Sequence, residues 1–231
     1  FCNQPVELTV DGGGLVHAFV WTAEGSASRL SHYRRDAGGV WAAQTPAYES
    51  TDPRFVLTAF DVAVDRSGGF HAAVARQTIP GESPVVREVR YQRFTGIGWS
   101  SEVVASVVSP AERVSLALDG ADIGHVAQGT ASRYFRRVPP WSTAPDLREG
   151  TDANSTGIVL ARDELGGIVL AYGFSPDQYV IRRRAPDGTL TTLLRLPSSG
   201  LASPTMDLDL VVQGRTAHLA YLALESGAPR I

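Results

Sequence analysis

The stretch Phe60-Asp-Val-Ala-Val-Asp65-Arg-Ser-Gly-Gly-Phe-His71 recurs along this chain and determines the fold that we predict for it. An earlier copy reads Val6-Glu-Leu-Thr-Val-Asp11-Gly-Gly-Gly-Leu-Val-His17, and a later one reads Val114-Ser-Leu-Ala-Leu-Asp119-Gly-Ala-Asp-Ile-Gly-His125. The fourth copy, Ile158-Val-Leu-Ala-Arg-Asp163-Glu-Leu-Gly-Gly-Ile-Val169, lacks the histidine. The fifth, Met206-Asp-Leu-Asp-Leu-Val-Val-Gln-Gly-Arg-Thr-Ala-His218, lacks the aspartate and aligns with one extra residue in its turn. Each copy predicts an alternating strand, an Asp-x-x-Gly turn and a second apolar strand.

A second motif follows the first in most copies. Tyr33-Arg-Arg35-Asp-Ala-Gly-Gly-Val-Trp41 matches Tyr91-Gln-Arg93-Phe-Thr-Gly-Ile-Gly-Trp99, and a shorter version is Phe135-Arg-Arg137-Val-Pro-Pro-Trp141. A degenerate version begins at Ile181-Arg-Arg183. Each reads as a strand, a Gly or Pro turn and a last strand opened by a bulky residue. The repeating unit is therefore four short strands in about 45–55 residues, a period typical of propeller blades.

These units predict an all-β protein, a β-propeller of four-stranded antiparallel blades that forms one domain over residues 1–231. A four-stranded meander alone buries neither face well, whereas neighbouring blades cover both faces. About five blades are visible, and their expected ranges are 5–50, 56–108, 112–153, 156–199 and a partial 205–231. The last blade lacks its third and fourth strands. An open sheet edge attracts another strand, so we expect a strand-completing partner or a homo-oligomer there.

Composition excludes several classes of partner. The net charge is −3 and the 21 basic residues are all arginine, so no overall basic field favours nucleic acid. No apolar run is long enough to predict a membrane span. The single cysteine, Cys2, allows no intrachain disulfide, and we expect no role for it. A mature secreted protein would have this composition, so we expect an extracellular or cell-surface location.

The Asp-x-x-Gly-x-x-His repeat resembles that of bacterial secreted β-propellers in the broad sialidase and Asp-box-like group. The resemblance covers nearly the whole chain at the level of fold and implies a propeller. It does not extend to the Asp-box itself, which has Ser before the aspartate and Trp after the glycine.

The loops at one end of the predicted blades differ in every unit, whereas the Asp-x-x-Gly turns at the other end repeat. Variation at one end of a repeated scaffold is what a binding surface produces. We therefore predict a lectin-like, non-enzymatic protein that binds carbohydrate or a protein partner through these loops, without a cofactor or a metal. The candidate binding residues are Trp21, Glu24, Arg76, Gln128 and Asp177.

An alternative hypothesis is a glycoside-active enzyme. Glu7, Asp61 and Asp207 align at one position of the predicted first strands, and Asp209 lies two residues further on. First strands of propeller blades line the central channel, and carboxylates about 5 to 9 Å apart can perform acid–base chemistry on sugars. A third hypothesis is an assembly subunit whose open last blade is completed by another chain.

The most regular residues have a structural interpretation. We expect each turn aspartate to accept hydrogen bonds from its own turn, and the glycines that follow, Gly14, Gly68 and Gly166, to adopt positive φ. Each repeat histidine is expected to bond to its own turn or to the next blade. His32, which no repeat explains, is expected to be exposed.

Overall fold

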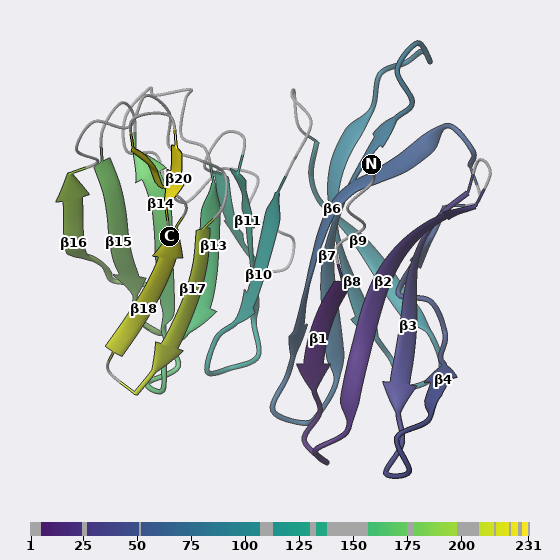
Figure 1. Ribbon diagram of the computed structural model, residues 1–231, viewed down its shortest axis with the longest axis horizontal. Coiled ribbons are helices and arrows are strands. Elements are labelled where there is room, and N and C mark those ends of the chain that lie inside the picture. The colour runs from purple at the N-terminus through teal and green to yellow at the C-terminus, as the bar shows by residue number, and fades with distance from the viewer. Residues whose placement is uncertain are drawn as a thin grey trace. The chain divides into compact units, whose positions relative to one another are not determined.

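The computed structural model in Figure 1 describes residues 6–24, 27–50, 52–106, 113–129, 133–137, 157–174, 178–197, 208–214, 216–221, 223–225 and 228–230. Regular structure in these ranges consists almost entirely of antiparallel β-strands, which confirms the all-β prediction. The chain divides into two compact units, residues 1–111 and 112–231. The division falls between the second and third predicted blades.

The described part of the first unit forms two sheets in which consecutive strands are neighbours. The first contains β1 (Val6–Val10), β2 (Val16–Glu24), β3 (Ala27–Arg35) and β4 (Trp41–Ala43), and β5 (Tyr48–Glu49) also pairs with β3. The second contains β6 (Phe55–Val64), β7 (Phe70–Thr78), β8 (Arg87–Phe94) and β9 (Trp99–Ser106). Both are the predicted four-stranded meanders.

The second unit continues the same order of strands. Its sheets contain β10 (Val114–Leu118), β11 (Gly124–Gln128) and β12 (Arg133–Arg136), then β13 (Ile158–Arg162), β14 (Ile168–Phe174), β15 (Gln178–Arg184) and β16 (Leu190–Pro197). A two-stranded sheet of β17 (Leu208–Gln213) and β18 (Thr216–Tyr221) follows, and β19 (Ala223–Glu225) and β20 (Ala228–Arg230) form a separate hairpin.

Each sheet has two distinct faces, because side chains alternate along a strand. We call the face that carries the repeat histidine, or Val169 in its place, the histidine face, and the other the reverse face. In the first unit, Phe19 and Leu30 on the histidine face of β1–β4 pack with Phe60 and Val74 on the reverse face of β6–β9. The histidine face of one sheet therefore covers the reverse face of the next.

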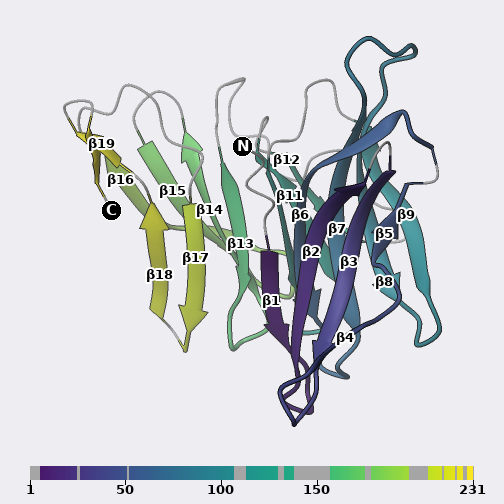
Figure 2. The same cartoon turned by 45° about the vertical axis from the view of Figure 1, so that its right-hand side comes forward.

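The second unit repeats this packing twice. Ala127 and Tyr134 of β10–β12 pack on Leu170 of the next sheet, and Tyr179, on the other side of that sheet, packs on Leu210 of β17. The first strand of every sheet lies at a sheet edge. β1 lies beside β6 in the first unit, and β13 lies between β10 and β17 in the second (Figures 1 and 2).

The turn of the fifth copy differs from its prediction. Gln213 pairs with Thr216 across a tight turn in which Gly214 has a φ of 62°. Six residues, 212–217, separate Val211 from its partner His218, whereas seven, 10–16, separate Thr9 from His17. The connection in the fifth copy is thus one residue shorter than in the first copy, so the prediction of an extra residue in its turn was wrong. The first strand of this hairpin, β17, continues further toward the turn than β1 does.

Candidate functional site

The Asp-x-x-Gly turns are built as predicted. Asp119 Oδ1 accepts hydrogen bonds from the N–H groups of Ala121 and Ile123, at 2.8 and 3.0 Å, and Asp11 Oδ1 is bonded in the same way. Gly14, Gly68 and Gly166 have φ values of 81°, 86° and 78°. The local hydrogen bonds of the aspartate and the freedom of glycine at positive φ therefore explain this motif.

In the first three sheets, the second oxygen of the turn aspartate binds the repeat histidine. The distances from Oδ2 to the histidine Nε2 are 3.2 Å for Asp11–His17, 3.1 Å for Asp65–His71 and 3.2 Å for Asp119–His125. All three histidines are buried. An ionised carboxylate only accepts hydrogen bonds, so Nε2–H donates and Nδ1 is left as an acceptor.

A side chain of the third strand binds the Nδ1 atom of each of these histidines. We call the resulting set of turn aspartate, repeat histidine and third-strand side chain a relay. The hydroxyl groups of Tyr91 and Tyr134 donate to His71 and His125. In the first sheet His32 takes this place, with its Nε2 2.8 Å from His17 Nδ1. Both ring nitrogens of His17, His71 and His125 are thus engaged within their own sheets, which confirms the structural interpretation for these three. His218 is exposed, in a hairpin that has no turn aspartate.

The prediction that His32 is exposed was wrong. His32 is buried and stacks on Phe19, with the ring centroids 4.4 Å apart. It pairs with Phe19 in the ladder, as Tyr134 pairs with Ala127. The equivalent third-strand residues are therefore His32, Tyr91 and Tyr134, and not Tyr33, Tyr91 and Phe135. The physical reason is the length of the turn before the tryptophan, which spans residues 36–40 in the first sheet and 95–98 in the second and so shifts the register by one residue.

The fourth sheet replaces the relay by an ion pair. Val169 stands in the place of the histidine, and Arg183, its partner in the ladder, donates from Nε to Asp163 Oδ2. An arginine opposite the missing histidine thus supplies the donor that the turn carboxylate needs.

The relays shift the acidity of their members. Burial alone would raise the pKa of Asp119, but hydrogen bonds from His125 and from the turn N–H groups lower it to about 2. Similar bonds from Ser67, His71 and Gly69 outweigh burial and lower the pKa of Asp65 to about 2. Burial, together with His17 and Arg34, lowers the pKa of His32 to about 4.

We predict that His32→Tyr will flatten the pH dependence of stability in the first unit. The pKa of folded His32, about 4, lies below the ordinary value of 6.5. The wild-type contribution is therefore complete above about pH 6.5 and is lost as the pH falls toward 4, since the unfolded chain takes up the proton more readily. Tyrosine does not titrate in this range and restores the relay of the other sheets.

The measurement is urea unfolding of both proteins at about pH 7 and about pH 4.5. The variant should lose less stability between the two conditions. An equal loss in both proteins would show that His32 does not control this dependence. The comparison is made relative to each protein's own value at neutral pH, so a uniform change in stability does not affect it.

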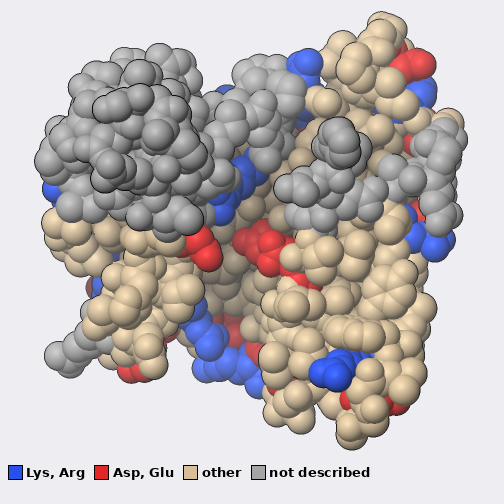
Figure 3. Space-filling model, viewed as in Figure 1, with Lys and Arg blue, Asp and Glu red and all other residues tan. Residues whose placement is uncertain are grey.

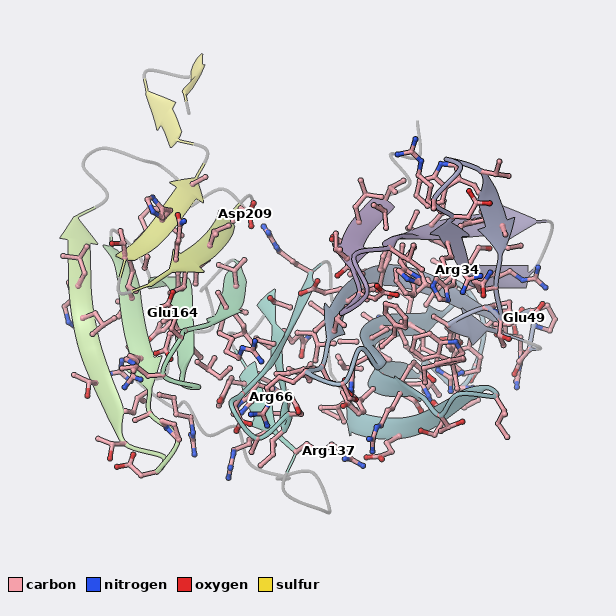
Figure 4. The ribbon with its side chains drawn as sticks, turned by 90° about the horizontal axis from the view of Figure 1, so that it is seen from below. Arg34, Glu49, Arg66, Arg137, Glu164 and Asp209 are labelled. Atoms are coloured by element: carbon pink, nitrogen blue, oxygen red, sulfur yellow. The ribbon has the colours of Figure 1, made fainter. Side chains whose placement is uncertain are left out.

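The first strand of each sheet has one equivalent position. It lies two residues before the residue that pairs with the repeat histidine, or with Val169 in the fourth sheet. The pairing places Glu7, Asp61, Ser115, Val159 and Asp209 there. Asp209, which Figure 4 labels on the sheet of β17 and β18, thus occupies the position that the sequence predicted for Asp207. Asp207 lies outside the described residues. The shorter turn of the fifth copy causes this difference of two residues.

Polar members of this row bond to the backbone of the edge strands. Asp61 Oδ1 accepts from the N–H of Val62 at 2.8 Å, and Asp209 Oδ1 accepts from that of Leu210 at 2.9 Å. Ser115 Oγ accepts from the N–H of Leu160, on the next sheet, at 3.0 Å. An edge strand has N–H groups that no neighbouring strand can accept from. Each of these three side chains accepts a hydrogen bond from one such group.

Glu7 and Asp61 each lie on the histidine face of their own sheet. Glu7 pairs with Phe19, on the side of β1–β4 that packs against β6–β9. Asp61 alternates with Phe60 and Val62, which pack toward that first sheet, so the side chain of Asp61 points away from it.

The binding candidates lie in different surroundings. Trp21 packs against the core of the first unit, and its Nε1 has no hydrogen-bond partner among the described residues. The Arg76 guanidinium bonds to Glu88 and Tyr48 and lies 4.2 Å from the ring centroid of Phe55. Gln128 is fully buried at the end of β11. Glu24 ends β2 but its side chain is outside the described part, as is Asp177.

The sequence did not predict two features, the burial of His32 and the alignment of Asp209 with the other first-strand positions.

The described residues contain no group of three or more His, Cys, Asp or Glu side chains placed to hold a metal ion. They also include no helix of the length and apolarity that crossing a membrane requires.

No protein-family model matches the chain, and no curated protein matches its sequence. Its structure is similar to a protein of unknown function from Dyadobacter fermentans, with 12% identity and a TM-score of 0.60 over 96% of this chain and 75% of that one. It is also similar to the polysaccharide lyase Uly1, with 10% identity and a TM-score of 0.57 over 96% of this chain. A fructofuranosidase from Schwanniomyces occidentalis, complexed with fructose, has 11% identity and a TM-score of 0.54 over the same share.

The chain spans 55% of the lyase and 52% of the fructofuranosidase, about half of each protein. At these identities the similarity defines the class of fold, an all-β protein of antiparallel four-stranded sheets.

Proposed function

We propose that the protein is a β-propeller that binds carbohydrate, and that first-strand carboxylates contact the sugar. Asp209 carries the proposal. Its side chain is exposed, and its Oδ1 is held by the N–H of Leu210. A carboxylate fixed through one oxygen presents the other in a defined direction, and sugar hydroxyl groups are donors that such an oxygen recognises.

A further observation supports this proposal. Two of the proteins similar in structure are a polysaccharide lyase and a fructofuranosidase complexed with fructose, which favours a carbohydrate over a protein ligand. An extracellular or cell-surface location and membership of the sialidase-like group of secreted bacterial propellers belong to the same proposal.

The test is binding of the full chain to an array of fructans and acidic and neutral polysaccharides, followed by titration of the best ligand. Asp209→Asn keeps an oxygen for the Leu210 N–H but removes the charge, so it should weaken binding by about tenfold or more. Asp36→Asn is the matched control, because Asp36 is also exposed and also bonds a backbone N–H, that of Val40. Retention of no polysaccharide by the wild-type protein would refute the proposal.

A glycoside-active enzyme is the second candidate, favoured by the names of the similar proteins. It is tested by incubating the wild type with each retained polysaccharide and measuring new reducing ends or unsaturated sugars. Release of products that Glu7→Gln and Asp61→Asn abolish would replace the binding proposal with this one.

A further inference from the structure

Two arginines and a glutamate form a cluster in the first unit. Arg76, Glu88 and Arg90 lie on the reverse face of β6–β9, toward the loop end, which is the end opposite to the Asp-x-x-Gly turns. Arg76 Nε and Nη2 are 3.1 and 2.9 Å from Glu88 Oε2, and Arg90 Nη1 donates to the same oxygen at 3.0 Å. One carboxylate therefore serves two permanently charged guanidinium groups, so the cluster has an excess positive charge.

Neighbouring side chains hold this cluster in place. Tyr48, on the first sheet, is 8% exposed and accepts a hydrogen bond from Arg76 Nη1 at 3.2 Å. The ring centroid of Phe55 is 4.2 Å from the guanidinium carbon of Arg76. Arg90 Nε donates to Ser101 Oγ at 2.9 Å. Both guanidinium groups keep further N–H donors, and Tyr48 keeps its O–H, that have no acceptor among the described residues.

Two carboxylates at the same end have arginine partners of their own. Glu49 and Asp52 form ion pairs with Arg29 and Arg54, so neither neutralises the cluster. Acidic and basic side chains accordingly appear together at the loop end of the first unit, at the upper right of Figure 3. The arginine side chains of the cluster are 18% and 19% exposed, largely shielded from water but reachable from it. A partly buried excess charge of this kind favours an anionic ligand.

The cluster is not part of the repeat. Arg76 is five residues after the repeat histidine of β7. The same position holds Thr22 in the first sheet and, counted from Val169, Phe174 in the fourth. The packing of successive sheets therefore does not require an arginine here, whereas the relay recurs in three sheets. Arg76 was also one of the binding residues that the sequence predicted.

We propose that the cluster of Arg76, Glu88 and Arg90 binds a carboxylate group of an acidic polysaccharide. This inference rests on the proposed carbohydrate binding and names the class of carbohydrate. Guanidinium groups bind carboxylates through pairs of N–H donors, and the O–H of Tyr48 supplies another donor beside them. Glu88 shares these donors, so it competes with the carboxylate of the ligand. All of these residues belong to the first unit, so the site needs no particular arrangement of the two units.

The first experiment compares binding of the full chain to polygalacturonate and to its methyl ester, which lacks the charge. The wild type should bind polygalacturonate more tightly by about tenfold or more, because hydrogen bonds to charged groups are strong. Added salt should reduce this difference. Equal affinity for the two polymers overturns the present proposal and leaves that of carbohydrate binding in place. Retention of neither these polymers nor any polysaccharide of the array overturns both.

The second experiment tests the cluster itself. Arg90→Gln should weaken binding of polygalacturonate by about tenfold or more. Arg93→Gln is the matched control, because Arg93 is exposed on the same strand but lies on the histidine face. Glu88→Gln should bind polygalacturonate more tightly, since it removes the competing charge. Thermal unfolding shows which variants are folded. Equal binding by Arg90→Gln and Arg93→Gln, or weaker binding by folded Glu88→Gln, overturns the proposal.

Discussion

Asp119→Ala is expected to destabilise the second unit by about 3–5 kcal/mol, one of the largest effects of a single side chain in this protein. The carboxylate accepts three hydrogen bonds, from the N–H groups of Ala121 and Ile123 and from Nε2 of His125. Alanine leaves those donors unsatisfied, and His125 is buried where water does not replace the lost acceptor.

The matched control is Asp187→Ala. Asp187 is an exposed turn aspartate that accepts a hydrogen bond from the N–H of Thr189 at 2.9 Å. Its loss should cost much less than the loss of Asp119, because water can replace the acceptor at an exposed turn. Urea unfolding followed by circular dichroism, compared at constant m-value, measures both changes. Equal losses in the two variants would mean that the relay adds nothing beyond the turn.

The Asp119 effect should also depend on pH. The pKa of folded Asp119 is about 2, below its ordinary value of 3.8. The carboxylate therefore contributes its full stability above about pH 5, and the contribution is lost as the pH falls through 4 toward 2. The difference between wild type and Asp119→Ala should be largest at neutral pH and should shrink in acid.

Gly166→Ala is expected to cost about 2–5 kcal/mol, through strain and a collision together. A Cβ at Gly166 would lie 2.8 Å from Gly120 Cα and 3.2 Å from Gly120 N, and the φ of 78° disfavours any side chain. These two turns, on successive sheets, are also joined by a hydrogen bond of 2.9 Å from Gly120 N–H to Gly166 C=O. Neither backbone can move without loss of this bond.

Gly14→Ala separates the two causes. Gly14 occupies the same turn position with a φ of 81°, but no other atom lies within 4 Å of a Cβ placed there. Its substitution should cost about 1–2 kcal/mol, the strain of the left-handed conformation alone. Thermal unfolding of each variant gives the comparison. If Gly166→Ala were as mild as Gly14→Ala, the close approach of the two turns would not constrain the packing of the sheets.

The alternation of apolar residues and the repeated turn motif predicted the strands of the first, second and fourth sheets, and they predicted the bonds of Asp11 and Asp119. Both signals are local. A turn aspartate reaches N–H groups two and four residues away, whatever the rest of the chain does. For this reason the motif was the most reliable guide in the sequence.

The burial of His32 and the alignment of Asp209 depended on tertiary structure. Each follows from which residue stands opposite which across a ladder, and turns of different length shift that pairing without a signal in the strands themselves. Local sequence signals therefore suffice to place the strands, the turns and their repeat. Tertiary structure decided which side chains share a face and which faces are covered, because register and sheet packing are set by contacts between residues distant along the chain.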